Sequence, residues 1–204
     1  MEDLLAYLPY STIVEYTTGQ IVYNPERPPT GLYLVIDGKI KVSRLADNGD
    51  QVVVDIYKAD EFFGESSLLN AGDHAEQATA LDKAKVMTWT AAELENMILK
   101  RPRLGLAILQ MLVQRAMGFS QRIETFSLDN IECRLARSLI RFSERLGVSE
   151  DDGAVRMVPL THQLLAEYVG TSREVISHYM RQFQSQGYLF TGGMILQLIP
   201  DEPR

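Results

Sequence analysis

Two neighbouring charged side chains, Arg173 and Glu174, have the chemistry needed to read the edges of DNA bases. A guanidinium can donate two hydrogen bonds to O6 and N7 of guanine, and a carboxylate can accept one from the amino group of cytosine. In helical phase Ser177 and His178 share the polar face of this pair, whereas the opposite face is apolar. The pattern therefore predicts a helix with one face for a protein core and one face for double-stranded DNA.

The surrounding residues predict how that helix is positioned. The stretch 160–188 is typical of two short amphipathic helices separated by a turn at Gly170. Glycine accepts the left-handed backbone that follows a helix C-terminus. Thr171 is expected to be the N-cap of the second helix, with Glu174 completing a capping box. This is the layout of a helix-turn-helix, whose second helix enters the major groove by its N-terminal end.

A hairpin signal follows directly after the two helices. Residues 189–191 and 194–198 form two short strand patterns on either side of Gly192 and Gly193. Together these segments predict a winged helix-turn-helix. The alternative is a packed helical hairpin with no DNA role, in which Glu174 only caps its helix and Arg173 is a solvated surface charge.

The net charge of −7 opposes a purely electrostatic attraction to nucleic acid, because nonspecific affinity comes mainly from cationic side chains. Within 160–192, Glu167 and Glu174 balance Arg173 and Arg181, so the expected footprint is neutral. We therefore expect binding that depends on base contacts and on phosphate contacts at helix termini, with a shallow salt dependence.

Composition and motifs argue against several other classes of protein. No apolar run is long enough to span a membrane and no secretory signal is visible, so a cytoplasmic protein is expected. The single Cys133 cannot form an internal disulfide or hold an iron–sulfur cluster. A cupin-type metalloenzyme would need several histidines in the N-terminal half, and His74 is alone there. We expect no enzyme and no metal site, and a pure interaction module remains the third alternative.

Residues 1–90 have the pattern of a small antiparallel β-roll or jelly roll. The clearest signal is a predicted hairpin of 31–36 and 39–43 around Asp37-Gly38, a typical type I′ turn. A second turn is expected at 47–50. Further strands are predicted at 51–57, 77–81 and 85–89.

The period becomes helical after residue 90, which gives an α+β fold class overall. Helices are predicted at 91–99 and at about 103–126. The long helix carries a heptad seam that we expect to form a homodimer interface, consisting of Leu109, Leu112, Ala116, Phe119, Ile123 and Phe126. Packing of that seam against its own roll is the alternative. The residues left for the intramolecular contact are Leu106, Met111, Val113 and Met117.

Capping character at 128–130 predicts a boundary there, so that 91–128 connects and dimerises and 129–204 forms the DNA-binding domain. Residues 131–146 are expected to form another helix, and 147–158 an exposed acidic loop or turn.

This order of β-roll, long helix and winged helix-turn-helix resembles the CRP/FNR family of bacterial transcription regulators over essentially the whole chain. The most specific matching segments are TSREVIS at 171–177 and FGE at 63–65 with Leu68. The resemblance implies a homodimer that binds a palindromic TGTGA-like operator and contacts RNA polymerase through exposed loops such as 149–156.

Carried over by position, the resemblance implies that Arg173 and Glu174 read the guanine and the cytosine of each half-site. The residues at positions that touch the DNA backbone are Thr161, Gln163, Thr171 and Ser172. Two departures leave the outer half-site open. His178 stands where the cyclic-AMP receptor branch has a third base-reading arginine, and Gly192 stands where that branch has a wing histidine.

The resemblance also implies an effector pocket in the roll, formed by Gly64, Glu65, Ser66, His74 and Gln77. In the nucleotide-binding branch, the glutamate holds the ribose and an Arg-Ser pair binds the cyclic phosphate. Here His74-Ala75 or Gln77-Ala78 takes the place of that pair, and no arginine occurs between Arg44 and Arg101. In addition, Gly118-Phe119 replaces the Thr-Ser that contacts adenine.

A phosphodiester without a guanidinium partner loses its strongest hydrogen bonds, so we predict that cyclic AMP is not bound. Haem held through His74, another small effector, and no effector at all remain alternatives.

Overall fold

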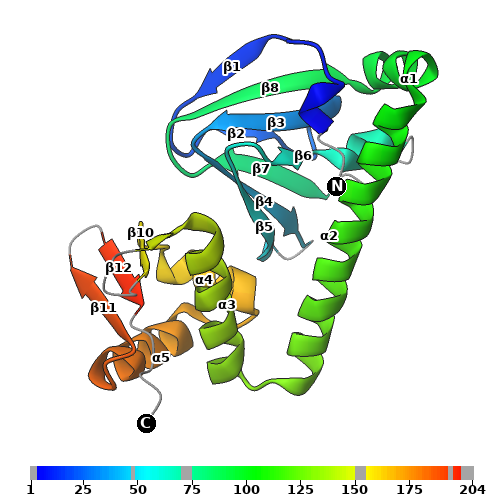
Figure 1. Ribbon diagram of the computed structural model, residues 1–204. Helices are drawn as coiled ribbons and strands as arrows, with labels where there is room; N and C mark the ends of the chain where they lie inside the picture. Colours follow the sequence, from blue (N-terminus) through cyan, green and yellow to red (C-terminus); the bar gives the residue numbers. More distant parts are fainter. Residues whose placement is uncertain (1–3, 47–48, 70–74, 150–154, 193–194, 199–204) are drawn as a thin grey trace. The chain divides into compact units, whose positions relative to one another are not determined.

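The computed structural model describes residues 4–46, 49–69, 75–149, 155–192 and 195–198, and Figure 1 labels most of its helices and strands. The chain divides into two compact units, 1–121 and 122–204. No helix in the described part of the chain is long and apolar enough to cross a membrane.

The first unit contains two antiparallel four-stranded sheets, in the orders β1-β8-β3-β6 and β2-β7-β4-β5. The strands are β1 (Ile13–Tyr16), β2 (Ile21–Tyr23), β3 (Gly31–Asp37), β4 (Lys39–Leu45), β5 (Gln51–Lys58), β6 (Phe62–Phe63), β7 (Glu76–Ala80) and β8 (Ala84–Thr90). Two 3₁₀ turns, η1 (Leu4–Ala6) and η2 (Glu65–Leu68), accompany them. The predicted antiparallel β-roll is confirmed.

Strand β3 lies between β8 and β6 in the first sheet, and both of its faces are buried. Tyr33 and Val35 belong to a core with side chains from both sheets, including a stack of Tyr33 on Phe63 with ring centroids 5.1 Å apart. Leu32 and Leu34 belong to a second core that the first sheet shares with the helices of this unit. Burial on both faces removes the alternation of polar and apolar residues from this strand.

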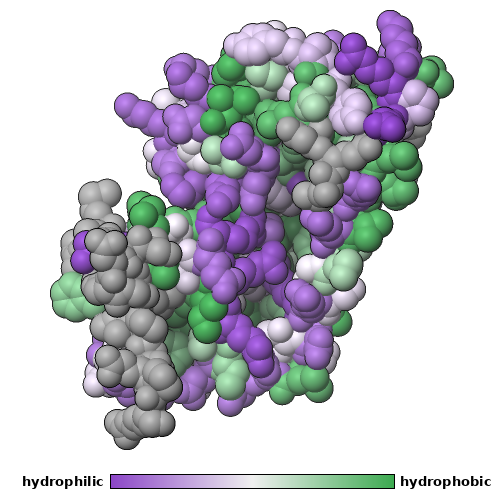
Figure 2. Space-filling view, in the orientation of Figure 1, coloured by the Kyte–Doolittle hydropathy of each residue, from purple (hydrophilic) through white to green (hydrophobic). Residues whose placement is uncertain are grey.

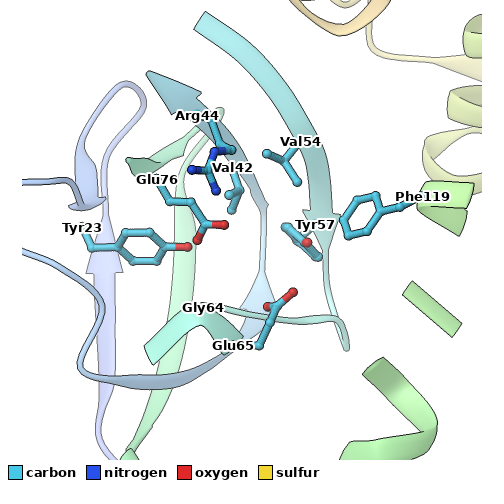
Figure 3. Close-up of a pocket in the computed structure, with 9 residues that line it drawn as sticks. All are labelled: Tyr23, Val42, Arg44, Val54, Tyr57, Gly64, Glu65, Glu76 and Phe119. Carbon is cyan, nitrogen blue, oxygen red and sulfur yellow. The ribbon is translucent and has the colours of Figure 1, made fainter. Parts of the chain in front are cut away.

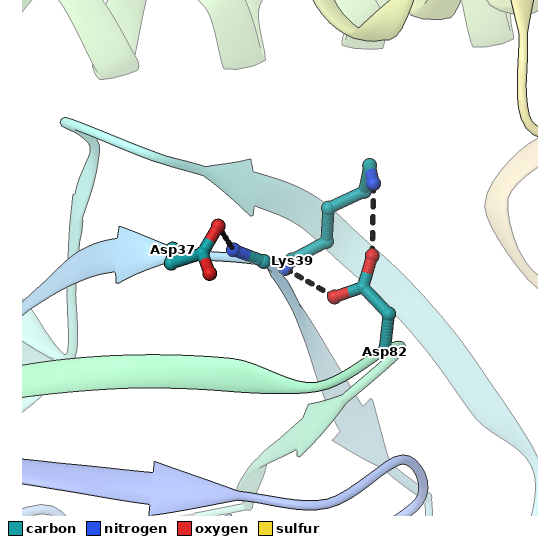
Figure 4. Close-up of polar contacts among 4 residues, drawn as sticks. Asp37, Lys39 and Asp82 are labelled. Atoms are coloured by element: carbon teal, nitrogen blue, oxygen red, sulfur yellow. Dashed lines mark hydrogen bonds and ion pairs between the residues drawn. The ribbon is translucent and has the colours of Figure 1, made fainter.

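The predicted hairpin at Asp37-Gly38 is wrong, because β3 pairs with β6 and β8 whereas β4 pairs with β5 and β7. The chain turns there but passes from one sheet to the other. Figure 4 shows the cause: the Asp82 carboxylate accepts hydrogen bonds from the backbone N–H of Lys39 at 2.6 Å and from its Nζ at 2.8 Å. Gly38 is required, since its φ is +80° and a Cβ would lie 2.3 Å from the carbonyl oxygen of Lys83.

Helices α1 (Ala91–Lys100) and α2 (Pro102–Leu128) follow the roll. Thr90 and Glu93 form a capping box at the start of α1, and the Thr90 contacts lower the pKa of the Glu93 carboxyl. Proline suits the first position of α2, where its missing N–H has no helical partner in any case.

The face that α2 turns toward its own unit differs from the prediction. Leu104, Ala107 and Ile108 are buried in the second core, and Met111 and Leu112 are partly buried against it. The predicted intramolecular contact is therefore confirmed for Met111 and wrong for the other three side chains. Leu106, Val113 and Met117 are 55%, 50% and 61% exposed.

The second unit contains α3 (Ile131–Leu146), α4 (His162–Val169), α5 (Arg173–Ser185) and an antiparallel sheet in the order β11-β12-β10-β9. Its strands are β9 (Val148–Ser149), β10 (Val155–Met157), β11 (Leu189–Gly192) and β12 (Ile195–Leu198). The predicted wing hairpin is confirmed by the pairing of β11 with β12. The ends of the segment predicted as an acidic loop are strands, since β10 pairs with both β12 and β9, whereas residues 150–154 in its middle lie outside the described residues.

The last two turns of α2 are built into this second unit. Arg122 donates a hydrogen bond to the carbonyl oxygen of Tyr168 at 2.8 Å, and its guanidinium lies 4.0 Å from the centre of the Tyr168 ring. Phe126 lies under the guanidinium of Arg134, 4.9 Å from its ring centre. A cation over an aromatic face is attracted by the ring quadrupole, so these contacts hold the end of α2 against α4 through Tyr168 and against α3 through Arg134.

Candidate nucleic-acid interface and effector pocket

Helix α5 presents the predicted base-reading residues to solvent. Arg173, Glu174 and His178 are exposed, whereas Ile176 and Met180 on the opposite face are buried in the second unit. The two faces that the sequence predicted are therefore present, and the polar face is open at the N-terminal end of the helix.

The N-cap of α5 is Ser172 and not Thr171 as predicted. The Ser172 hydroxyl accepts a hydrogen bond from the backbone N–H of Val175 at 3.4 Å. Glu174 is thus the second residue of the helix, where its own backbone N–H and the Ser172 hydroxyl lower the pKa of its carboxyl. It is an ionised acceptor at neutral pH, as pairing with a cytosine amino group requires.

The turn before α5 depends on Gly170, as the sequence predicted. Its φ is +74°, and its backbone N–H donates to the carbonyl oxygen of Ala166 at 2.8 Å. A Cβ at this position would lie 2.9 Å from Cε1 of Phe126. Thr161 caps α4 by accepting from the N–H of Leu164 at 3.1 Å, so the hydroxyl expected at the DNA backbone also starts the helix.

Of the other residues expected at the DNA backbone, Gln163 and Ser172 are exposed and Thr171 is half-buried. The side-chain amide of Gln163 donates to the carboxylate of Glu167 at 3.0 Å. Ser177, expected to read bases, is half-buried and hydrogen-bonded inside the protein, with its hydroxyl donating to the carbonyl oxygen of Arg173 at 2.8 Å.

His162 is a residue of this surface that the sequence argument did not single out. Its Nδ1 lies 2.8 Å from the Ser177 hydroxyl, so it connects the start of α4 to the polar face of α5. Burial and the nearby Arg173 guanidinium lower the pKa of its imidazole. No spacing rule would have paired residues 15 positions apart, because the turn at Gly170 sets the angle between the two helices.

The first unit contains a cavity of about 220 Å³ on the side of the roll near α2. Figure 3 shows its walls: Tyr23, Val42, Arg44, Val54, Tyr57, Gly64, Glu65, Glu76 and Phe119. Two of the predicted effector residues, Gly64 and Glu65, line it. Ser66 donates to the Glu76 carboxylate at 2.8 Å and Gln77 donates to Thr79 at 3.2 Å, while His74 lies outside the described residues.

The Glu65 carboxylate forms an ion pair with a residue of α2. The guanidinium of Arg115 forms an ion pair with the Glu65 carboxylate, donates to the carbonyl oxygen of Phe62, and lies 4.9 Å from the centre of the Tyr57 ring. Burial disfavours the charged guanidinium, but Tyr57 and Glu65 outweigh it and raise the pKa of Arg115. The acidic group expected to hold a ribose is therefore already neutralised by the chain itself.

A second guanidinium, from Arg44 on β4, reaches the same cavity. Neither Arg44 nor Arg115 lies in the segment where the resemblance places the phosphate-binding pair, because each comes from another element, so neither could be assigned to the pocket from the sequence. Arg44 lies directly opposite Glu76 in the pairing of β4 with β7. Opposite charges at such a position attract each other, so the cavity has balanced charges rather than an excess of positive charge.

The hydroxyl of Tyr23 is buried in the cavity wall and has no hydrogen-bond partner among the described residues. Burial, together with Glu76 and Glu65, raises the pKa of this phenol. It is therefore a neutral group that can donate or accept one hydrogen bond. No group of three or more metal-binding side chains occurs in the described part of the chain.

The residues predicted for the dimer seam have different surroundings. Leu109 and Ile123 are 56% and 66% exposed, and Ala116 is also exposed. Leu112 is partly buried in its own core, Phe119 lines the cavity, and Phe126 packs in the second unit. In Figure 2 apolar surface recurs along α2, where Leu106, Leu109, Val113 and Met117 are at least half exposed.

The fold and the open polar face of α5 define a winged helix-turn-helix DNA-binding protein with an effector-type β-roll. Comparison with protein families agrees: the cyclic nucleotide-binding domain matches residues 13–101, and the Crp-like helix-turn-helix domain matches residues 133–203. The chain belongs to the CRP/FNR family of transcription regulators.

Individual relatives are similar over most of their length. The CRP-like cAMP-activated global transcriptional regulator of Mycobacterium tuberculosis is 27% identical over 192 residues, which is 94% of this chain and 85% of that protein. The global nitrogen regulator of Synechococcus elongatus is 25% identical over 170 residues, or 82% and 77%. Among solved structures, FixK2 from Bradyrhizobium japonicum has the same fold, with a TM-score of 0.81 at 19% identity over 93% of each chain.

Proposed function

We propose that this regulator binds a palindromic TGTGA-like operator as a homodimer, with Arg173 and Glu174 of each protomer reading one half-site. The observation that carries the proposal is the exposure of both side chains at the open N-terminal end of α5. Both residues lie in the first turn of the helix, directly after its N-cap Ser172. RNA polymerase is the further partner that the family implies.

A mobility-shift or anisotropy assay with a palindromic TGTGA duplex and a scrambled duplex tests this. Loss of one bidentate arginine–guanine contact costs about 1–3 kcal/mol of discrimination. Arg173→Ala should therefore weaken specific binding by roughly 5- to 150-fold per half-site and leave scrambled binding almost unchanged. Arg27→Ala, which removes the same charge from an exposed site in the other unit, is the matched control. Equal behaviour of the two variants on both duplexes would show that α5 does not read bases.

The homodimer is proposed to form along α2. Support comes from the exposed apolar side chains Leu106, Leu109, Val113 and Met117, whose spacings of three and four residues follow one face of the helix. Ala116 and Ile123 of the predicted seam are also exposed. Two-fold pairing would bury this stripe and supply two reading helices for the two half-sites.

Cyclic AMP is proposed not to be the effector, although the Mycobacterium relative is named as cAMP-activated. Support comes from Arg115, which already pairs with Glu65, and from Arg44, which lies opposite Glu76. A cyclic phosphodiester would find no unbalanced cation among the described lining residues. Calorimetry should show no heat with cyclic AMP, and a Kd below about 100 μM, or −5.5 kcal/mol, would contradict the proposal.

The cavity is still a candidate site for another small effector. Its described lining contains no histidine, cysteine or methionine, and burial raises the pKa of its two phenols, Tyr23 and Tyr57, which disfavours the phenolate form that ligates haem iron. It also contains the Tyr23 hydroxyl, which has no hydrogen-bond partner among the described residues, and the apolar side chains of Val54 and Phe119. A small molecule that is neutral overall and forms hydrogen bonds suits this lining better than haem. Native mass spectrometry of the freshly purified protein would detect such a ligand.

A further inference from the structure

The cavity of the roll contains a buried hydroxyl that the described part of the protein leaves without a hydrogen bond. Tyr23 is 2% exposed, lines the cavity, and has no hydrogen-bond partner for its hydroxyl among the described residues. Such a group is rare in proteins, because burial removes its bonds to water and nothing replaces them. Figure 3 shows this hydroxyl pointing toward the same space as the side chains of Arg44 and Glu76. A ligand in that space would supply the missing bond.

The charges of the lining consist of one cation beside one anion. Arg44 on β4 lies directly opposite Glu76 on β7, and the remaining carboxylate, Glu65, is paired with Arg115. Both Arg44 and Glu76 can form further hydrogen bonds. A guanidinium has five N–H donors, and a carboxylate accepts about four bonds, of which the Ser66 hydroxyl donates one at 2.8 Å. A ligand with a net charge would bury that charge unbalanced, whereas a ligand with both charges matches each group.

The size of the cavity limits the ligand further. A cavity of about 150 Å³ holds benzene, so the volume of about 220 Å³ here suits a molecule of about nine non-hydrogen atoms. A cyclic nucleotide and a haem are far larger. Val42, Val54 and Phe119 form the apolar part of the lining. These features together suit a short apolar group joined to two opposite charges.

We propose that this cavity binds an α-amino acid with a small apolar side chain. The Arg44 guanidinium donates two hydrogen bonds to the ligand carboxylate, and the Glu76 carboxylate accepts from the ligand ammonium group. The Tyr23 hydroxyl donates to the same ligand carboxylate, and the apolar side chain contacts Val54 and Phe119. This inference rests on the proposed role of the cavity as an effector site, and it does not depend on how α5 reads DNA.

Calorimetry of the full-length protein tests the proposal with L-valine, L-leucine and L-methionine as probes. We expect a Kd of about 1 mM or tighter for at least one of them. Each probe is compared with analogues that lack the ammonium group or the carboxylate, which for leucine are isocaproate and isoamylamine. These analogues should bind weaker by about tenfold or more, because each leaves Glu76 or Arg44 unmatched. Equal affinity for a probe and its analogues, or no binding of any probe, would overturn the proposal.

Two variants locate the binding in the cavity. Tyr23→Phe should weaken binding of the probe by about tenfold or more, because it loses a hydrogen bond to a charged group. Tyr10→Phe is the matched control: its side chain is 82% exposed and lies outside the lining, so binding should be unchanged. Glu76→Gln keeps an acceptor for the Ser66 hydroxyl but loses the negative charge, so it should prefer isocaproate to leucine. Circular dichroism of each variant checks that the roll remains folded.

The outcomes distinguish this inference from the proposed function. Binding that is unchanged in both Tyr23→Phe and Glu76→Gln would overturn the inference, because the ligand would then lie outside this cavity. Failure of all three amino acids, together with another small neutral ligand found by native mass spectrometry, would overturn the inference and support the proposed effector role. The operator assay with Arg173→Ala is done without ligand, so its result is independent of this one.

Discussion

Replacement of Arg115 by methionine should destabilise the first unit, because it leaves the Glu65 carboxylate without its partner. The side chains of this ion pair are only 17% and 26% exposed. Removing one member of a fully buried pair costs about 3–5 kcal/mol. Partial hydration of Glu65 recovers some of that loss, so we expect a fall of about 2–3 kcal/mol in the free energy of unfolding. Methionine keeps most of the apolar contact with the Tyr57 ring, which isolates the electrostatic part.

The single tryptophan gives an assay that is specific to this unit. Trp89 is 3% exposed, packs with Phe62, and donates through Nε1 to the carbonyl oxygen of Pro9 at 2.9 Å. Its fluorescence during urea titration therefore reports unfolding of the roll in the intact chain. With a typical slope of about 1–3 kcal/mol per molar urea, the expected loss lowers the midpoint by about 1 M.

A double-mutant cycle separates the ion pair from simple loss of packing. Replacing Glu65 by glutamine in the Arg115→Met background removes the unpaired charge and should recover at least half of the loss. Arg27→Met, at an exposed position of the same unit, is the control and should leave the midpoint unchanged. A free energy of unfolding of Arg115→Met within about 0.5 kcal/mol of wild type would refute the reasoning, as would losses that are simply additive in the double variant.

Three further predictions concern the turn, the cavity and the helix face. Gly170→Ala should destabilise the second unit by about 1–2 kcal/mol, because of its positive φ and the approach to Phe126, and an unchanged melting temperature by circular dichroism would contradict this. Tyr23→Phe removes a buried hydroxyl without a partner and should stabilise the roll by about 1 kcal/mol; a lower urea midpoint would mean that the hydroxyl is bonded in solution. Val113→Glu should give monomers in sedimentation velocity whereas Gln114→Glu remains dimeric, and a dimeric Val113→Glu would exclude this face as the interface.

Helix ends and helix faces could be predicted from the sequence, because they depend on residues that are close together in the chain. Gly170 was predicted to end α4 because only glycine easily accepts the backbone angle that follows the helix. The apolar and polar stripes of α5 were equally readable, since a period of 3.6 residues places them on opposite faces. The N-cap was misassigned by one residue because both Thr171 and Ser172 have a suitable hydroxyl, and only the backbone angles distinguish them.

The wrong predictions concern strand pairing and helix packing, which depend on contacts between segments that are distant in the sequence. Asp37-Gly38 has the sequence of a hairpin turn, but Asp82, more than forty positions away, holds Lys39 so that β4 joins the other sheet. The face of α2 that packs on the roll was also misjudged, because leucines, valines and methionines occur on both faces and their pattern does not say which is covered.

The sequence by itself determined the class of protein, the order of most of its elements and the two exposed charged residues that are proposed to read DNA, because these follow from helical and strand periodicity and from the chemistry of single side chains. Only the tertiary structure brought Arg115 onto Glu65, placed Arg44 opposite Glu76, and joined His162 to Ser177. Each of these pairs is separated by at least 15 positions, and such contacts depend on how whole elements pack, which no local pattern encodes.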